Sequence, residues 1–84
     1  MEKSTFTREY KVLCELLRDK RQASGVTQVE LAEKLSETQS QISKWERGER
    51  RIDLVQLRTF CQVIGVSLSE FVAEFDKRVS KRRG

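Results

Sequence analysis

Histidine and proline are both absent from this chain of 84 residues, which has two cysteines and one tryptophan. Because histidine is missing and no nucleophile stands beside a base, the sequence argues against an enzyme. A metal site would need ligands that this chain does not group together, so we predict no metal and no cofactor. Cys14 and Cys61 both fall among apolar residues in helical segments, which favours reduced core residues over a disulfide or redox site.

Long apolar runs are absent as well. No stretch approaches the roughly 18 consecutive apolar residues that a membrane span needs. Residues 1–7 are polar apart from Phe6, unlike a signal peptide. We therefore expect a soluble, cytoplasmic protein, and 84 residues suffice for one domain with one small core.

The positive charge is concentrated at one end of the chain. The net charge is +4, but residues 77–84 alone hold five basic residues and no acid, leaving 12 basic and 13 acidic residues elsewhere. A nucleic-acid footprint on the globular part would therefore have to be local, and residues 44–51 are the first candidate. The basic tail is either a solvated charge run or a source of non-specific attraction to DNA.

Residues 27–48, TQVELAEKLSETQSQISKWERG, have the pattern of two short helices joined by a tight turn. Thr27 with Glu30, and Thr38 with Gln41, each fit a capping box, in which two residues satisfy each other's free backbone N–H groups. The segment between Thr38 and residue 48 is therefore expected to form a separate second helix.

That second helix has two unlike faces. Ile42 and Trp45 form its inner, apolar side, and Gly48 is placed to end it in a left-handed conformation. The outer side has no acidic residue and suits base edges and phosphates. Its members are Gln39, Ser40, Ser43, Lys44 and Arg47.

Three further helices are predicted around this pair. One spans residues 8–24, one follows the cap at Asp53, and one follows the cap at Ser67, where Gln56 and Glu70 complete capping boxes. Leu54, Leu57, Phe60, Cys61 and Ile64 form the apolar stripe of the fourth helix, and Leu68, Phe71 and Val72 complete the core from the fifth. We expect a compact all-α domain over residues 8–76, with flexible termini at 1–7 and 77–84.

Several residues of the 27–48 motif match a known pattern, and the match continues beyond it. The motif residues are Gln28, Ala32, Gln39, Ile42, Trp45, Glu46 and Gly48, followed by Leu57, Phe60, Cys61, Ile64, Gly65, Val66 and Ser67. Over roughly residues 10–72 the chain resembles the Cro/repressor (XRE-type) family of helix-turn-helix DNA-binding regulators. The resemblance implies a lambda-repressor-like five-helix bundle, with helices 2 and 3 forming the helix-turn-helix. Ser36 departs from the family, which has glycine where the turn needs a positive φ.

The resemblance implies a transcriptional regulator that binds duplex DNA sequence-specifically, with helix 3 in the major groove. Helical position assigns base contacts to Gln39, Ser40 and Lys44, where glutamine suits adenine and lysine suits guanine. Phosphate contacts are assigned to Thr27, Gln28, Ser43, Arg47, Arg50 and Arg51.

The resemblance also pairs Arg21 with Glu46 in a structural ion pair between helices 1 and 3. Phe75 and Val79 lie far along the stripe of helix 5, where little chain remains to cover them, so we predict a homodimer through this face on a palindromic site. Alternatives are a controller protein of a restriction–modification system, and an antitoxin or protein-interaction module of the same fold; an enzyme is a distant third.

Overall fold

The computed structural model describes residues 7–83, which fold into five α-helices and, within that range, no strand. The number and order of helices agree with the prediction from sequence. The helices are α1 (Arg8–Ala23), α2 (Gln28–Leu35), α3 (Gln39–Arg47), α4 (Leu54–Ile64) and α5 (Leu68–Arg83). Nowhere in residues 7–83 does a helix combine the length and apolar character that crossing a membrane requires.

Local caps explain where the helices begin. The predicted capping boxes of α2 and α4 are complete, because Glu30 and Gln56 return a bond to the backbone of the cap residue. At Thr38 and Ser67, within residues 7–83, only half of each box forms: the hydroxyl accepts from the backbone N–H three residues on. A single cap bond still satisfies one of the free donors of the first turn.

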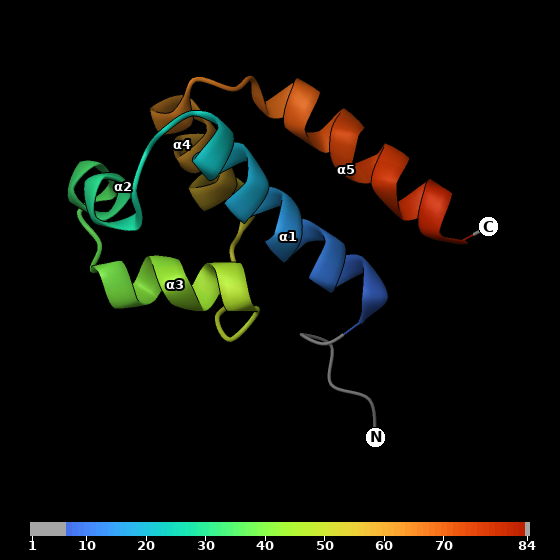
Figure 1. Ribbon diagram of the computed structural model, residues 1–84, viewed down its shortest axis with the longest axis horizontal. Helices are drawn as coiled ribbons and strands as arrows, with labels where there is room; N and C mark the ends of the chain where they lie inside the picture. Colours follow the sequence, from blue (N-terminus) through green and yellow to red (C-terminus); the bar gives the residue numbers. More distant parts are fainter. Residues whose placement is uncertain (1–6, 84) are drawn as a thin grey trace.

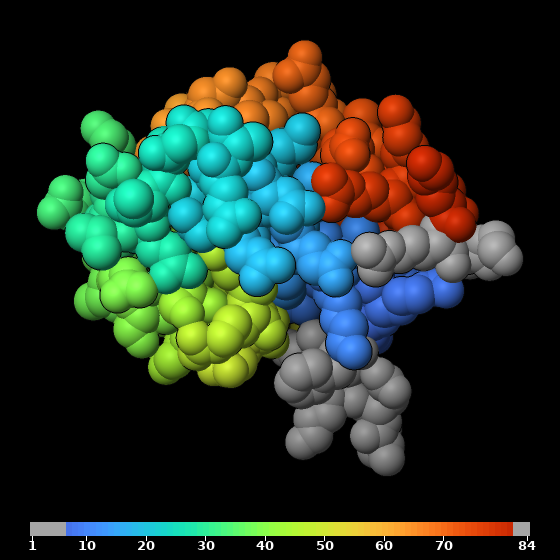
Figure 2. Space-filling model, in the orientation of Figure 1, coloured from blue at the N-terminus to red at the C-terminus, as the bar shows by residue number. Residues whose placement is uncertain are grey.

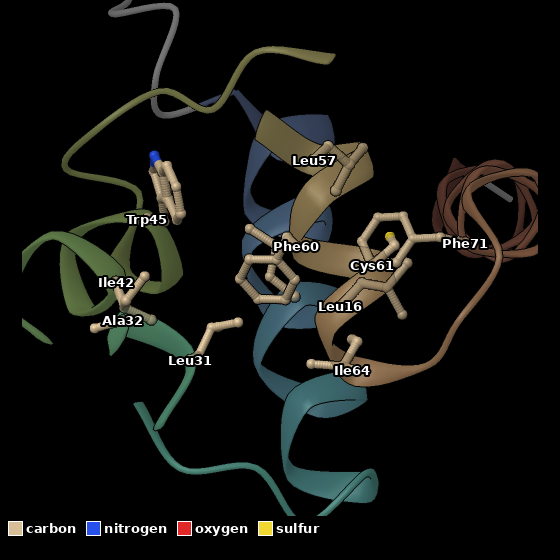
Figure 3. Packing of buried hydrophobic residues seen from close by; sticks show 11 residues of the cluster. Leu16, Leu31, Ala32, Ile42, Trp45, Leu57, Phe60, Cys61, Ile64 and Phe71 are labelled. Carbon is tan, nitrogen blue, oxygen red and sulfur yellow. The ribbon is translucent and has the colours of Figure 1, made fainter. Parts of the chain in front are cut away.

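α1 occupies the middle of the molecule, with α3 against one side and α5 antiparallel along another (Figure 1). α2 packs on α3 and α4, and α4 also packs on α5. The core lies where these helices meet (Figure 3). Trp45 extends from α3 toward Phe60 of α4, their ring centroids 6.2 Å apart, and Phe71 closes the core from α5. The position of Trp45 in the core fixes which side of α3 faces outward.

The structure differs from the sequence prediction in the burial of two residues and at both ends of the described chain. Leu54 and Val72, expected in the core, are 66% and 43% exposed. Residues 77–83, expected to be flexible, continue α5, and Arg78 bonds both Asp19 and Glu74 at 3.0 and 3.1 Å. Residues 1–6 of the predicted flexible N-terminus lie outside the described part, and Thr7 caps α1 by accepting from the Tyr10 N–H.

The turn between α2 and α3 uses a left-handed residue that is not glycine. Ser36 has φ 56° and ψ 41°, whereas the comparable residue after α3 is Gly48 with φ 81°. A side chain with a Cβ in this region costs about 1–2 kcal/mol. The turn therefore has the positive φ that the motif requires, and Ser36 adopts it under strain.

Candidate nucleic-acid interface

α3 is covered on one side only. Its inner residues Ile42, Trp45 and Glu46 are buried, at most 9% exposed. On the outer side, the predicted base-contacting residues Gln39, Ser40 and Lys44 are all exposed. In Figure 2, α3 and the loop after it form the surface at the lower left of the face shown. The helix thus presents a polar, acid-free row of side chains to solvent.

A buried ion pair fixes α3 to α1. The Nε of Arg21 lies 2.6 Å from Oε2 of Glu46, and its Nη2 lies 3.0 Å from Oε1. Nη1 of the same guanidinium donates to the Val26 carbonyl at 2.9 Å. This is the two-pronged arginine–carboxylate geometry, which is stronger and more directional than a single contact. These are the two residues that the resemblance paired.

Two glutamines extend this pair to the outer face of α3. Nε2 of Gln28 donates to Oε1 of Glu46 at 3.0 Å. Nε2 of Gln39 then donates to Oε1 of Gln28 at 2.8 Å. Gln39, the first predicted base reader, is therefore linked through one side chain to the buried carboxylate. The sequence motif placed both glutamines near DNA but gave no sign of the bond between Gln28 and Glu46.

Arg47, predicted to contact phosphate, is exposed and held by its neighbours. Its Nη2 and Nε contact the two carboxylate oxygens of Glu49 at 2.9 and 3.1 Å, and its Nη1 also bonds the Ser43 hydroxyl. The Arg47 guanidinium lowers the pKa of the Glu49 carboxyl, chiefly through these hydrogen bonds. Both side chains are more than half exposed, so a phosphate can reach this arginine.

The loop after α3 is anchored by two aromatic side chains. The Tyr10 hydroxyl donates to the Arg50 carbonyl at 3.3 Å and accepts from the Ile52 N–H at 3.2 Å. Nε1 of Trp45 donates to the Arg51 carbonyl at 3.3 Å. None of these bonds was predicted from the sequence, and the partners of the first Tyr10 bond are 40 residues apart, which leaves no local signal. They hold the basic loop in a fixed position beside α3.

The two arginines of that loop stack on the same aromatic rings. The Arg50 guanidinium lies 4.8 Å from the Trp45 ring centroid and also contacts Glu37 at 3.3 Å. The Arg51 guanidinium lies 4.7 Å from the Tyr10 ring centroid. Stacking orients a planar cation while leaving its edges able to bond an anion. Arg50 is half-buried and Arg51 exposed, so the two differ in access.

The predicted phosphate contacts at the start of α2 are both accessible. Thr27 is exposed and its hydroxyl accepts from the Glu30 N–H as the helix cap. Gln28 is half-buried, and together with Gln39 it lines an open groove at the surface. A helix N-terminus presents free N–H groups and a positive dipole end, which favour an anion.

α5 carries an apolar stripe that the rest of the described chain covers only in part. Val72, Phe75 and Val79 are spaced three and four residues apart, which places them on one face. Phe75 and Val79 are half-buried, and Phe75 packs against the core. Phe75 is therefore more covered than expected, because α5 packs along α1 and the ring lies partly against the core.

The cysteines have the environment of core residues. Both are buried, and burial raises the pKa of the Cys14 thiol to about 11 and also raises that of Cys61. Reactive thiols have a lowered pKa, so these two are poor nucleophiles at neutral pH.

Comparison with known proteins agrees with this geometry. The helix-turn-helix family model HTH_3 matches residues 17–71. A solved XRE-family-like protein from Pseudomonas syringae pv. tomato is 37% identical over 83% of this chain and 85% of its own, with a TM-score of 0.77. The clp gene regulator ClgR from Corynebacterium glutamicum is 26% identical over 92% of this chain and 82% of its own, with a TM-score of 0.81.

A third solved structure shares the fold. The restriction–modification controller protein C.Esp1396I is 24% identical, covers 89% of this chain and 97% of its own, and has a TM-score of 0.80. Among curated proteins, none matches the chain. The family match spans most of the chain and includes α2 and α3, whose outer face is the polar surface described above. The chain therefore belongs to the XRE-type helix-turn-helix family of DNA-binding transcriptional regulators.

Proposed function

We propose that this protein binds a specific duplex DNA sequence with α3 in the major groove, and that it does so as a homodimer on a palindromic site. The observation that carries the proposal is the two-sided character of α3. Trp45 and Glu46 anchor its inner side in the core, while Gln39, Ser40 and Lys44 stand exposed on the other. A helix held rigidly with its polar face outward fits the major groove of B-form DNA.

The base-reading roles follow from side-chain chemistry. Gln39 and Ser40 open the first turn of α3, the end of a recognition helix that reaches deepest into the groove. The Gln39 amide suits adenine N6 and N7, and Lys44, one turn further on, suits guanine N7 and O6. The half-site should therefore hold an A·T pair facing Gln39 and a G·C pair facing Lys44.

Phosphate contacts flank this row on both sides. Thr27 and Gln28 stand at the N-terminus of α2, and Ser43, Arg47, Arg50 and Arg51 lie along α3 and its following loop. Contacts to phosphate set the register on the duplex and add affinity without reading sequence. The exposed Arg47–Glu49 pair supports this role, because an exposed pair is weak enough to be exchanged for a phosphate.

Dimerisation is proposed through the partly covered apolar stripe of α5, with Phe75 and Val79 in the interface. Val72 extends that stripe and is 43% exposed. A two-fold dimer would hold two α3 helices about 34 Å apart, the length of one turn of DNA. A controller role in a restriction–modification system is the subtype alternative, which a dimerising α5 would fit. A partner-binding antitoxin is the alternative from another class.

The proposed function assigns no catalytic role, and the proposed location is the cytoplasm, with the DNA. Selection of binding sites from a random duplex pool tests it directly. The wild type should enrich one palindromic sequence, and Gln39→Ala should lose the preference at one base pair of each half-site. Failure to enrich any sequence, with the protein folded, would contradict sequence-specific binding and favour the antitoxin reading.

The dimer is tested by sedimentation. Val79→Glu should shift the protein toward monomer, because it places a charge in the proposed interface. Leu54→Glu is the matched control: Leu54 is exposed on α4, so this variant should sediment as the wild type does. Should Val79→Glu and the wild type sediment alike, the interface is not on α5.

A further inference from the structure

The bonds between Glu46, Gln28 and Gln39 run in one direction, and that direction is fixed by charge. An ionised carboxylate can only accept hydrogen bonds, so the Gln28 atom 3.0 Å from Glu46 must be its NH2 group. The amide oxygen of Gln28 then faces Gln39. That oxygen can only accept, so the Gln39 atom 2.8 Å away must be its own NH2 group.

The bond to Gln28 therefore also determines which amide atoms Gln39 presents to a ligand. One N–H of its amide is used by Gln28, which leaves one N–H and the carbonyl oxygen for a ligand. Adenine presents one acceptor, N7, and one donor, N6–H, in the major groove. Guanine presents two acceptors, N7 and O6, and would need two outward donors. In this orientation, Gln39 matches adenine and mismatches guanine.

We propose that Glu46 is a positioning residue for base recognition, which acts through Gln28 to orient the Gln39 amide toward adenine. This inference rests on the proposed function and adds to it a role for a buried residue that touches no DNA. Glu46 is suited to the task because its carboxylate is held rigidly by Arg21 and is 9% exposed, so water does not compete for Oε1. The remaining N–H of Gln28 is still available for the phosphate contact proposed above.

Removing the carboxylate tests the role of Glu46. Oε1 of Glu46 accepts from both Arg21 Nη2 and Gln28 Nε2, so an apolar residue at position 46 leaves Gln28 without its fixed acceptor. Glu46→Leu is made together with Arg21→Met, because replacing both members of a buried pair by apolar residues strands no charge. In this double variant the amides of Gln28 and Gln39 should be free to turn, and the preference for A·T over G·C should be lost.

Two further variants separate orientation from stability. Arg21→Lys weakens the ion pair but leaves Glu46 ionised and accepting only, so the orientation should persist. Gln28→Met leaves Arg21 and Glu46 unaltered and removes the link, so Gln39 should turn freely and read neither base well. This variant tests the link even if the double variant is too unstable to assay.

The experiment measures affinity for two duplexes that differ only at the base pair facing Gln39, at a temperature where circular dichroism shows each variant folded. The wild type should prefer A·T by about 5- to 150-fold, and Arg21→Lys should keep that ratio within about threefold. Gln28→Met and the Arg21→Met/Glu46→Leu double variant should each bring the ratio within about threefold of unity.

The outcomes distinguish a failure of this inference from a failure of the proposed function. A wild-type ratio retained in Gln28→Met, or in the folded double variant, overturns the inference while sequence-specific binding stands. So does a Gln39→Ala variant that selects the wild-type site. If the wild type binds neither duplex above the level of unrelated DNA, the proposed function fails and takes the inference with it.

Discussion

Glu46 and Arg47 are neighbours on α3, and each belongs to an arginine–glutamate pair, but the two pairs differ in burial. The side chains of Arg21 and Glu46 are 9% and 2% exposed, whereas those of Arg47 and Glu49 are 54% and 51% exposed. Both pairs have two-pronged geometry at similar distances. Both pairs join an arginine to a glutamate, and they differ in how much water reaches them.

Burial decides what each pair is able to do. A buried pair that loses one partner leaves a charge stranded away from water, so it is hard to break. An exposed pair is screened by salt and contributes little, so its arginine can exchange the carboxylate for another anion. One helical position therefore serves to hold α3 in place, and the next is available to bind DNA.

The largest expected effect is that of salt, which should weaken DNA binding far more than it weakens the fold. With about four to eight phosphates neutralised per dimer, log K should fall against log salt with a slope of roughly −4 to −7. Between 50 and 200 mM salt this is a loss of about 10²- to 10⁴-fold in affinity. The free energy of unfolding should change little, because the buried pair is poorly screened. Anisotropy titrations and urea unfolding at matched salt concentrations measure both, and a flat binding response would sink DNA recognition.

Breaking each pair from one side sharpens the contrast. Glu46→Ala should lower the free energy of unfolding by about 3 kcal/mol or more, because Arg21 is left buried and unpaired. Arg47→Ala should stay within about 0.5 kcal/mol of the wild type, as exposed substitutions usually do. Thermal or urea unfolding of the two variants is the measurement. Equal unfolding of Glu46→Ala and the wild type would mean that the pair carries no stability.

The exposed side of α3 should itself divide into base readers and phosphate anchors. Lys44→Ala should relax the preference at one base pair by about 1–3 kcal/mol, while Arg47→Ala and Arg50→Ala should weaken all sequences about equally. Binding-site selection repeated with each variant makes the distinction. If Lys44→Ala leaves the selected sequence unchanged and lowers every affinity alike, Lys44 is a phosphate anchor.

The smallest effect tests whether the turn before α3, rather than the buried pair, holds the helix in place. Ser36→Gly should relieve the left-handed strain, but glycine also loses more freedom on folding, so the net gain should be below about 1 kcal/mol. DNA affinity should stay within about twofold of the wild type. If Ser36→Gly stabilises the protein by as much as Glu46→Ala destabilises it in the same unfolding assay, the turn contributes as much as the buried pair to holding α3.

The helices and the two faces of α3 could be predicted from the sequence. The helices follow from caps and periodicity, which are local: the Thr27–Glu30 and Asp53–Gln56 boxes join residues three apart. The same periodicity separated Trp45 from Lys44 as inner and outer residues. The Arg21–Glu46 pairing came from the family resemblance rather than from any local pattern.

Where the periodic pattern misled, the reason is that it gives the direction of a side chain but not the extent of the core. Leu54 lies on the apolar stripe of α4, but it is the first residue of that helix. It is 66% exposed, so the stripe is longer than the part of α4 that is buried. Residues 77–83 were predicted to be flexible because they are mostly charged. In the structure α5 continues through them, and Arg78 forms an ion pair with Asp19 on α1.

The sequence by itself determined five helices, their caps and the polar row on α3, because each depends on residues within a few positions of one another. The positive φ at Ser36 was implied by the family resemblance. Only the tertiary structure decided that Tyr10 and Trp45 hold the loop after α3. It alone decided that Gln28 joins Glu46 to Gln39. Hydrogen bonds have a range of about 3 Å, so a bond between distant positions exists only once packing has set the distance.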